Sequence, residues 1–328
     1  MHATQGPPLT RLRVDDPTAD RGAVDRAGAV LRDGGLVALP TETVYGLGAN
    51  ALDADAVRRI FAAKGRPADN PLIVHLAAAE HLGQVAATIT DLARTLAARF
   101  WPGPLTIVVD AGDLPTVTTG GLRSVAVRVP AHPVARAIIA AAGVPVAAPS
   151  ANRSGRPSPT TADHVAADLG DHIDLLIDGG PTGLGLESTV VDARSDRPVI
   201  FREGALTREQ LGVMASAVAP DAPSPGTRYR HYAPACPVEI VEPGELAARV
   251  TALRGAGLRA GTVAPARLDT PGTVTIADFV DVDELARDLY GALRDAEAAD
   301  IDVLLCTAVP ETGVGRAVMD RLRRAAGG

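Results

Sequence analysis

Short apolar runs alternate with helical patterns along most of this chain, and this alternation constrains the fold more than any other feature of the sequence. Runs such as LVALP (36–40) and LTIVVD (105–110) have the length of buried strands. Segments such as 54–63 and 133–142 show the residue pattern of helices. Strands that alternate with helices predict an α/β fold, and the strand-rich stretch 173–202 indicates a mixed sheet.

A change in composition near residue 219 predicts a domain boundary. The stretch APDAPSPGTRYRHYAPACP is rich in proline and has no apolar periodicity, as expected of an extended linker. Strand and helix patterns then resume and form a second set. We therefore expect a twisted mixed α/β sheet with helices over 10–218, a linker over 219–237 and a smaller Rossmann-like α/β domain over 238–328.

Four local expectations can be checked against a structure. Residues 1–20 are polar and are expected to be loose. TETVYGLGAN (41–50) is expected to form a turn, in which Gly46 and Gly48 let the backbone bend tightly or come close to a ligand. The stretch 78–87 is expected to form a helix, and 144–150 a strand.

The overall charge argues against a protein whose bulk surface binds nucleic acid, although it leaves room for a local basic cavity. The chain of 328 residues has a formal net charge of −7 and a pI near 5.5. Its two cysteines, Cys236 and Cys306, lack metal-site spacing. Neither a signal-peptide pattern nor an apolar run of membrane-spanning length is found, so we expect a cytoplasmic protein without membrane contact.

Lys64 is the only lysine among 32 lysine and arginine residues, and this skew makes it a candidate functional residue. Where arginine replaces lysine almost everywhere, a lysine that persists indicates a position that needs a compact ammonium group. Lys64 and Arg66 in KGRPADN could bind a polyphosphate together, with Asn70 as a further donor. The alternative is a solvated helix end with cations near its C-terminus.

Two strand residues carry polar groups into apolar surroundings. His75 lies in PLIVHL and alternates with Ile73, so both are expected on one side of the strand. The alternative for His75 is a hydrogen-bonded core residue. Arg128 lies between valines in SVAVRVP, and a buried guanidinium needs an anion, either an internal carboxylate or one from a ligand.

Several loops at strand ends offer hydroxyl and amide groups to a ligand. They are SANRSGRPSPT (150–160), ESTVVD (187–192) and FREG (201–204). The linker sequence PGTRYRHYAP (225–234) is unusually aromatic and basic, which favours a strap that covers a site over a plain spacer. The sequence lacks the GxSxG, HExxH, GxGxxG and P-loop motifs, so it indicates a site that aligns substrates without a protein nucleophile.

Taken together, PTETVYGLG, KGR, NPLIVH, SVAVRVP, SAN, SGRPSPT, ESTVVD, FREG and PGTRYRHYAP closely resemble the YrdC-type L-threonylcarbamoyladenylate synthase family, in its longer two-domain form. The resemblance covers essentially residues 20–328, although the C-terminal part matches by position and pattern only. Thr227-Arg228 departs from the family's Met-Lys at that point of the linker.

The resemblance implies a nucleotidyltransferase that takes L-threonine, bicarbonate and ATP to threonylcarbamoyl-AMP and pyrophosphate. The product would pass to a separate tRNA threonylcarbamoyltransferase complex, for threonylcarbamoyladenosine formation on tRNA. The resemblance does not indicate whether this protein itself binds tRNA. Magnesium is expected as a cofactor held mainly by the ATP phosphates, without evident protein ligands.

The resemblance also assigns roles to individual residues. The expected catalytic residues are Lys64 and Arg66. The residues expected to hold threonine are Thr43, His75, Arg128 and Ser188. The residues expected to contact ATP are Lys64, Arg66, Asn70, Ser124, Ser150, Asn152, Ser158, Arg202, His231 and Tyr232.

Two other functions remain open from the sequence. YrdC-like domains are also described as RNA-binding modules, but the acidic balance and the few aromatic residues of this chain fit that poorly. Such domains also occur in carbamoyltransferases that use carbamoyl phosphate, and the partner domain of those enzymes is not evident here.

Overall fold

A computed structural model describes residues 9–212, 217–218 and 232–327. The chain divides into two compact units. The first unit comprises residues 1–154, 159–183 and 187–228, and the second comprises 155–158, 184–186 and 229–328. The division after residue 228 falls inside the expected linker, most of which lies outside the described residues.

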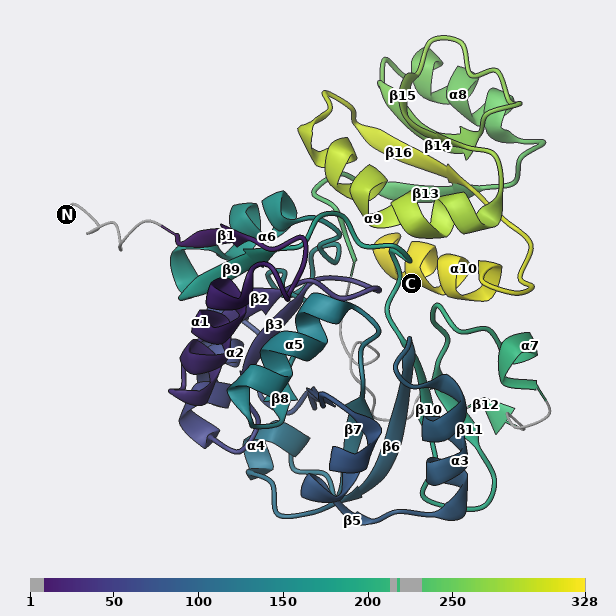
Figure 1. Ribbon diagram of the computed structural model, residues 1–328. Helices are drawn as coiled ribbons and strands as arrows, with labels where there is room; N and C mark the ends of the chain where they lie inside the picture. Colours follow the sequence, from purple (N-terminus) through teal and green to yellow (C-terminus); the bar gives the residue numbers. More distant parts are fainter. Residues whose placement is uncertain (1–8, 213–216, 219–231, 328) are drawn as a thin grey trace. The chain divides into compact units, whose positions relative to one another are not determined.

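The first unit is built on one mixed sheet, as the sequence predicted (Figure 1). In the described part of the chain it has twelve strands, in the order β1-β9-β2-β3-β8-β4-β7-β6-β10-β11-β12 with β5 beside β6. Their bounds are β1 Arg11–Arg13, β2 Val37–Leu39, β3 Gly46–Asn50, β4 Ile73–His75, β5 Ala86–Thr88, β6 Leu105–Ala111, β7 Ser124–Arg128, β8 Val146–Ala147, β9 Leu175–Asp178, β10 Thr189–Asp192, β11 Val199–Arg202 and β12 Ala217–Val218.

Capping residues fix both ends of α2. The Asp53 carboxylate accepts hydrogen bonds from the backbone of Asp55 and Ala56 and so begins α2, and Gly65 ends it with a left-handed φ of 60°. The α-helices are α1 Arg21–Arg32, α2 Ala54–Lys64, α3 Asp91–Phe100, α4 Thr116–Thr119, α5 Pro133–Ala142, α6 Ala162–Leu169 and α7 Arg208–Leu211, and the 3₁₀ helices are η1 Ala79–Gln84 and η2 Gly170–His172.

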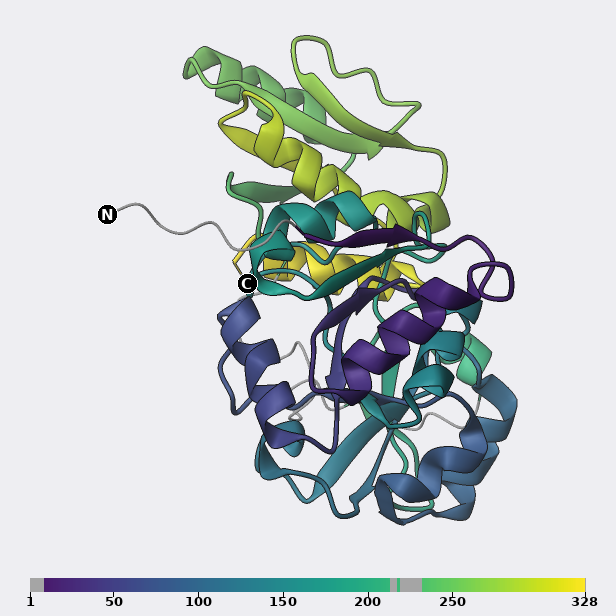
Figure 2. The same ribbon diagram turned by 60° about the vertical axis from the view of Figure 1, so that its left-hand side comes forward.

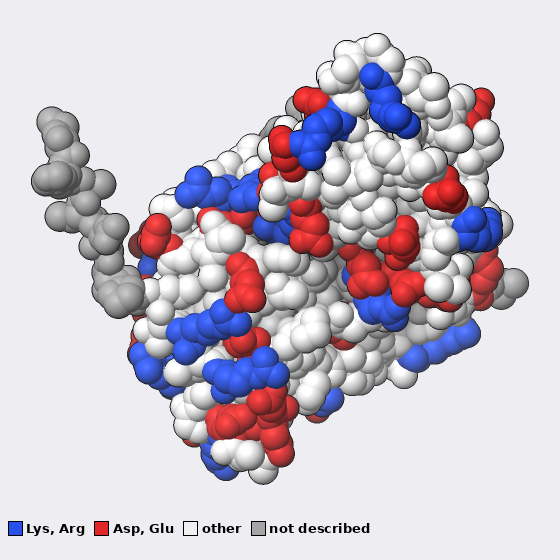
Figure 3. All heavy atoms as spheres, turned by 90° about the horizontal axis from the view of Figure 1, so that it is seen from above, with Lys and Arg blue, Asp and Glu red and all other residues white. Residues whose placement is uncertain are grey.

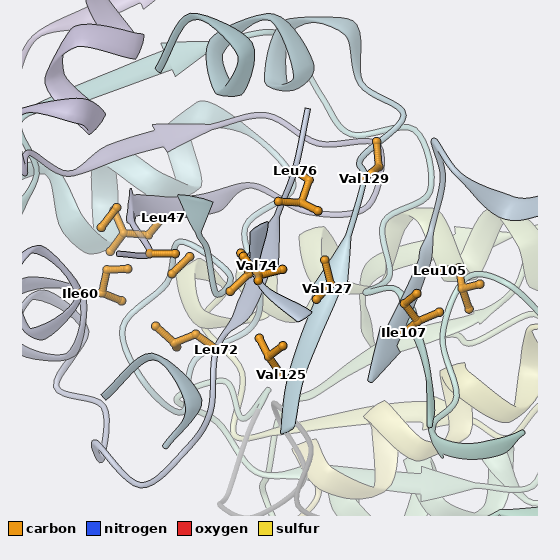
Figure 4. Close-up of a cluster of buried hydrophobic side chains, with 14 of the residues drawn as sticks. Leu47, Ile60, Leu72, Val74, Leu76, Leu105, Ile107, Val125, Val127 and Val129 are labelled. Carbon is orange, nitrogen blue, oxygen red and sulfur yellow. The ribbon is translucent and has the colours of Figure 1, made fainter. Parts of the chain in front are cut away.

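Two apolar cores lie on opposite faces of the sheet. The larger core joins α2, α3 and α6 to strand residues such as Val74, Ile107 and Val127, which come from three strands of the sheet (Figure 4). The other core joins α1 and α5, which pack side by side (Figures 1 and 2). A Cβ at Gly28 would lie 2.7 Å from the backbone of Ala141, so only glycine permits this close helix crossing.

The expectation that residues 1–20 are loose was wrong for β1. This short strand pairs in parallel with β9, and its two arginines form ion pairs with Asp178, which lies at the end of β9. An edge strand can therefore consist largely of polar residues, and for this reason the polar sequence RLR did not indicate a strand.

The expected turn at 41–50 was also wrong in its second half, because GLGAN forms β3, antiparallel to β2. A Cβ at Gly48 would lie 2.9 Å from Val146 of β8, so this glycine serves close strand packing and not a turn. The expected helix 78–87 is a 3₁₀ helix followed by β5, and the expected strand 144–150 is shortened to the two residues of β8.

The second unit contains a four-stranded parallel sheet in the order β13-β16-β14-β15, which confirms the expected smaller α/β domain. Its elements are β13 Val238–Val241, α8 Leu246–Gly255, β14 Ala260–Pro265, β15 Val274–Phe279, α9 Val282–Ala298, β16 Val303–Thr307 and α10 Gly315–Ala325. Within the described residues, no helix is long and apolar enough to cross a bilayer.

Two short segments from the middle of the chain belong to this second unit. In segment 155–158, Arg156 forms an ion pair with Glu297, and the Pro157 carbonyl accepts a hydrogen bond of 2.5 Å from Arg294. In segment 184–186, a Cβ at Gly185 would lie 2.1 Å from the carbonyl oxygen of Arg287. Both segments therefore pack directly against α9.

Candidate functional site

Strand β7 separates the larger core from the opposite face of the sheet, which carries both polar and apolar side chains. Val125 and Val127 point into the larger core, and the alternation of a strand puts Ser124, Ala126 and Arg128 on the opposite face. Ala126 packs there in a small cluster with the apolar side chains Ile73, Val108 and Val190. We call this side of β4, β6, β7 and β10 the site face.

Arg128 lies at the end of β7 and is engaged by groups of the protein itself. Its Nη2 lies 2.7 Å from Oε1 of Glu42, its Nη1 donates to Oγ1 of Thr43 at 2.9 Å, and its Nε donates to the carbonyl of Gly103 at 3.1 Å. The Nη2 group is not aligned for a hydrogen bond to Glu42, so that contact is an ion pair. The internal carboxylate that the sequence left open is therefore present.

The ion pair sets the charge of Glu42. Burial alone would raise the pKa of this carboxyl, but the adjacent Arg128 and nearby backbone N–H groups together lower it below the usual value. Glu42 is consequently ionised at neutral pH. The cluster also contains Thr41, whose Oγ1 lies 2.8 Å from that of Thr43.

His75 lies beside Arg128, because β4 and β7 pair in parallel with these two residues as partners. Its Nδ1 lies 3.3 Å from the Ile73 carbonyl. Burial, and then the charge of Arg128, lower the pKa of His75 to about 3, against a weaker opposing effect of Glu42. His75 is therefore a neutral imidazole at physiological pH, able to accept or donate a hydrogen bond without adding charge.

This buried neutral histidine predicts a loss of stability in acid. Its folded pKa lies below the unfolded value near 6.5, so the unfolded chain binds the additional proton, and stability falls as pH drops from 6.5 toward 3. Between pH 6.5 and 3, the free energy of unfolding should therefore fall more steeply with decreasing pH in the wild type than in the His75→Gln variant. The difference between the two slopes should be about 1.4 kcal/mol per pH unit. Urea unfolding at pH 7, 6 and 5 measures it, with exposed His172→Gln as the control. Parallel pH profiles for wild type and His75→Gln would contradict it.

Ser188 lies at the same end of the site face, immediately before β10, the strand that pairs with β6. Its Oγ lies 2.7 Å from Oγ1 of Thr106, and the β6–β7 register, continued by one residue, places Thr106 beside Arg128. The buried Arg202 of β11 donates through Nη2 to the Ser188 carbonyl at 2.9 Å and to its Oγ at 3.2 Å. The four residues expected to hold threonine thus converge at one end of β7.

Lys64 lies against the loop that follows β8. It is buried, and its ammonium donates hydrogen bonds to the backbone carbonyls of Ser150 and Asn152. Within the loop, Oγ of Ser150 donates to Oδ1 of Asn152 at 2.6 Å, and Nδ2 of Asn152 donates to the Arg153 carbonyl at 2.8 Å. The structure therefore brings together three residues expected to contact ATP.

Asn70 provides an unsatisfied amide near the start of β4. It is fully buried, and neither its Nδ2 nor its Oδ1 has a hydrogen-bond partner among the described residues. Such groups are rare in native proteins, so the donor and acceptor of this amide are available to a polar ligand. Nearby, Arg66 donates to the Pro71 carbonyl at 3.3 Å. The parallel register of β4 and β7 places Ser124 at this same end of the two strands.

Three residues that the resemblance assigns to ATP are not among the described residues of the first unit. Ser158 is buried in a segment that belongs to the second unit. Tyr232 also belongs to the second unit, where its ring stacks on Tyr290 at 5.3 Å and lies 5.5 Å from the guanidinium of Arg321. His231 lies outside the described residues.

The sequence reasoning missed Glu42 and Thr106. Glu42 precedes Thr43 in a quoted motif, and a search for the anion that Arg128 requires could have considered it. Thr106 carries no signal in the sequence, because only the pairing of β6 with β7 and β10 reveals its place. No group of three or more histidine, cysteine, aspartate or glutamate side chains suited to a metal occurs in the described ranges, so magnesium on the substrate phosphates stays a prediction.

Comparisons with known proteins identify the family. A family model described as Telomere recombination (Sua5/YciO/YrdC) matches residues 29–204, and one described as Threonylcarbamoyl-AMP synthase, C-terminal domain, matches 200–327. The threonylcarbamoyl-AMP synthase of Pyrococcus abyssi is 46% identical over 318 residues, which span 92% of this chain and 93% of that protein. The chain belongs to the threonylcarbamoyl-AMP synthase family.

Two further similarities extend over nearly the whole chain. The threonylcarbamoyl-AMP synthase of Bacillus subtilis is 42% identical over 334 residues and covers 96% of both chains. A crystal structure of P. abyssi Sua5 complexed with L-threonine matches with a TM-score of 0.91 and 44% identity, over 97% of each chain. Both units of this protein therefore have counterparts in the family.

Proposed function

We propose that this protein condenses L-threonine, bicarbonate and ATP into threonylcarbamoyl-AMP and pyrophosphate. Relatives named for this activity match both units, and one relative was crystallised with L-threonine. The observation that carries the proposal is the arrangement of the site face. Thr43, His75, Arg128 and Ser188 lie at one end of β4 and β7, and the unsatisfied Asn70 lies at the other end.

The end that contains Arg128 suits the amino acid. The threonine carboxylate would meet the guanidinium of Arg128, which Glu42 already holds in place. Thr43 and Ser188 offer hydroxyl groups, and neutral His75 adds a polar contact without a second positive charge. This combination can recognise a small amino acid that has its own hydroxyl group.

The end that contains Asn70 suits the nucleotide. The amide of Asn70 has unused donor and acceptor capacity, and the cations Lys64 and Arg66 lie on the same segment of chain. These cations would neutralise charge on the phosphates, and magnesium would be held there by phosphate oxygens and water.

The reaction needs no nucleophile from the protein. The threonine amine attacks the carbon of bicarbonate, an N–C bond forms as a C–O bond breaks, and the released hydroxyl group leaves as water with a proton from the amine, which gives a carbamate. A carbamate oxygen then attacks the α-phosphorus of ATP, its bond to phosphorus forms, and pyrophosphate leaves with the electrons of the broken P–O bond. The protein contributes orientation and charge neutralisation, which dominate catalysis of transfer at phosphorus.

The product is a reactive mixed anhydride, so the reaction class that follows must be transfer of the threonylcarbamoyl group. We propose that a tRNA threonylcarbamoyltransferase complex receives it. Arginine, aspartate and glutamate side chains are interspersed on the face seen in Figure 3, without a continuous basic surface. This arrangement does not favour an RNA-binding module as the function.

Isotope exchange between pyrophosphate and ATP tests the proposal. We expect exchange only when L-threonine and bicarbonate are both present, with threonylcarbamoyl-AMP detected by mass spectrometry. Turnover of carbamoyl phosphate without exchange would indicate a carbamoyltransferase instead. Tight RNA binding without either reaction would indicate an RNA-binding module.

A further inference from the structure

A cavity of about 770 Å³ opens at the carboxyl edge of the parallel sheet in the second unit. Residues that end or follow each of its four strands line the cavity, and α10 contributes Met319 and Arg323. In open parallel α/β sheets, ligands bind at this edge, and the volume lies within the range of about 300–1,000 Å³ typical of ligand pockets. None of the residues assigned above to threonine or ATP lines it.

The cavity has an apolar wall. Ile240, Pro265, Phe279, Val309 and Met319 contribute from three strands, a strand-end loop and α10. Four of these side chains are buried and Ile240 is partly buried, so the wall is a fixed part of the core. A concave apolar wall of this kind accommodates the apolar part of a small molecule.

Two charges of opposite sign flank this wall. Glu242 follows β13 and Arg267 follows β14, and both line the cavity. Because β16 lies between these strands, their backbones are about 10 Å apart. Neither side chain has an ion pair or hydrogen bond within the described residues, whereas Arg323 is paired with Glu311.

The remaining charges argue against a nucleotide or another polyanion. The lining carries three carboxylates, those of Glu242, Asp281 and Glu311, and only two guanidinium groups. The start of α9, which also borders the cavity, is already capped, because the Asp281 carboxylate accepts the backbone N–H of Glu284. A polyanion would therefore face a wall of net negative charge, while a zwitterion would find one partner for each of its charges.

We propose that this cavity binds a small zwitterion with an apolar side chain, of the size of an amino acid or a dipeptide. Its carboxylate would meet the Arg267 guanidinium, whose planar fork matches a carboxylate, and its ammonium group would meet Glu242. The apolar side chain would contact Phe279 and Met319. This proposal stands independently of the synthase reaction, because it uses none of that site's residues.

Calorimetric titration of the full chain with leucine, phenylalanine and leucyl-leucine tests the proposal. We expect at least one of these probes to bind, and its N-acetyl and C-terminal amide derivatives to bind about 10-fold or more weakly, because each loses one charge. Comparing the affinities of the free amino acids with that of the dipeptide shows which of these two kinds of zwitterion the cavity binds.

Charge-removing variants locate the binding. Arg267→Gln and Glu242→Gln should each weaken binding about 10-fold or more, since each removes a charge-assisted contact. Arg259→Gln is the matched control. Arg259 immediately precedes β14, whereas Arg267 follows it, so Arg259 lies at the end of this strand away from the cavity, where it is paired with Asp300. Its replacement should leave the affinity for the probes unchanged. Circular dichroism verifies that the variants are folded.

Three results would overturn the proposal. The first is an absence of binding by all three probes at millimolar concentration. The second is binding that Arg267→Gln and Glu242→Gln leave unchanged. The third is binding of AMP or ATP that Arg267→Gln abolishes, which would show that the cavity takes a nucleotide.

Discussion

Replacing Lys64 with arginine is expected to slow threonine-dependent pyrophosphate release by about 100-fold or more, although the charge is preserved. The Lys64 side chain is buried, and its compact ammonium already donates to two carbonyls of the loop after β8. A planar guanidinium is larger and cannot occupy the same position without displacing that loop, so it would misplace both Ser150 and Asn152.

Arg58→Lys supplies the matched control for this experiment. It makes the reverse exchange on the same helix, at an exposed side chain that pairs only with nearby Asp55 among the described residues, and should leave turnover unchanged. Because Lys64 also supports a loop, the melting temperature and the affinity for ATP are measured beside turnover. Wild-type turnover in Lys64→Arg would refute the inference that this position requires lysine.

Arg128→Leu is expected to lower the free energy of unfolding by about 3–5 kcal/mol, because it leaves the Glu42 carboxylate buried without its partner. Removing both charges, in Arg128→Leu with Glu42→Leu, should recover most of this loss. Both variants should nevertheless lose threonine binding, since neither keeps a cation for the substrate carboxylate. Urea unfolding and threonine titration measure the two effects separately.

Arg249→Leu is the comparison for an exposed pair. Arg249 and Glu239 lie at the surface of the second unit, where solvent screens the pair, so Arg249→Leu should lower the free energy of unfolding far less than Arg128→Leu. If the double variant at positions 42 and 128 remains as unstable as Arg128→Leu, then the Glu42 charge is not the source of the loss. If it still binds threonine at wild-type affinity, then Arg128 does not hold the substrate.

The sequence predicts helices well where their ends carry chemical signals. The expected range 133–142 coincides with α5, because Pro133 begins this helix and a left-handed Gly143 ends it. The expected range 54–63 agrees with α2 to within one residue, because Asp53 caps its start and Gly65 ends it. It predicts β3 poorly, because a glycine that admits a neighbouring strand looks the same as a glycine that makes a turn.

The same limit applies to the site. Composition alone made Lys64 a candidate, and the valines on either side of Arg128 predicted a buried guanidinium that needs an anion. The identity of that anion as Glu42 depends on a contact between residues 86 positions apart in the sequence. That the Asn70 amide lacks a partner in the described part of the chain is likewise a property of three-dimensional packing, which no local pattern encodes.

The segments 155–158 and 184–186 have a consequence for how the protein folds. Because of them the chain passes from one unit to the other at residues 154/155, 158/159, 183/184, 186/187 and 228/229, so the two units are interleaved in sequence. A chain cut after residue 228 would still encode Pro157 and Gly185 but not α9, against which both pack. The second unit is therefore not a detachable module: its fold cannot be completed until residues 155–158 and 184–186, which precede the linker, have joined it.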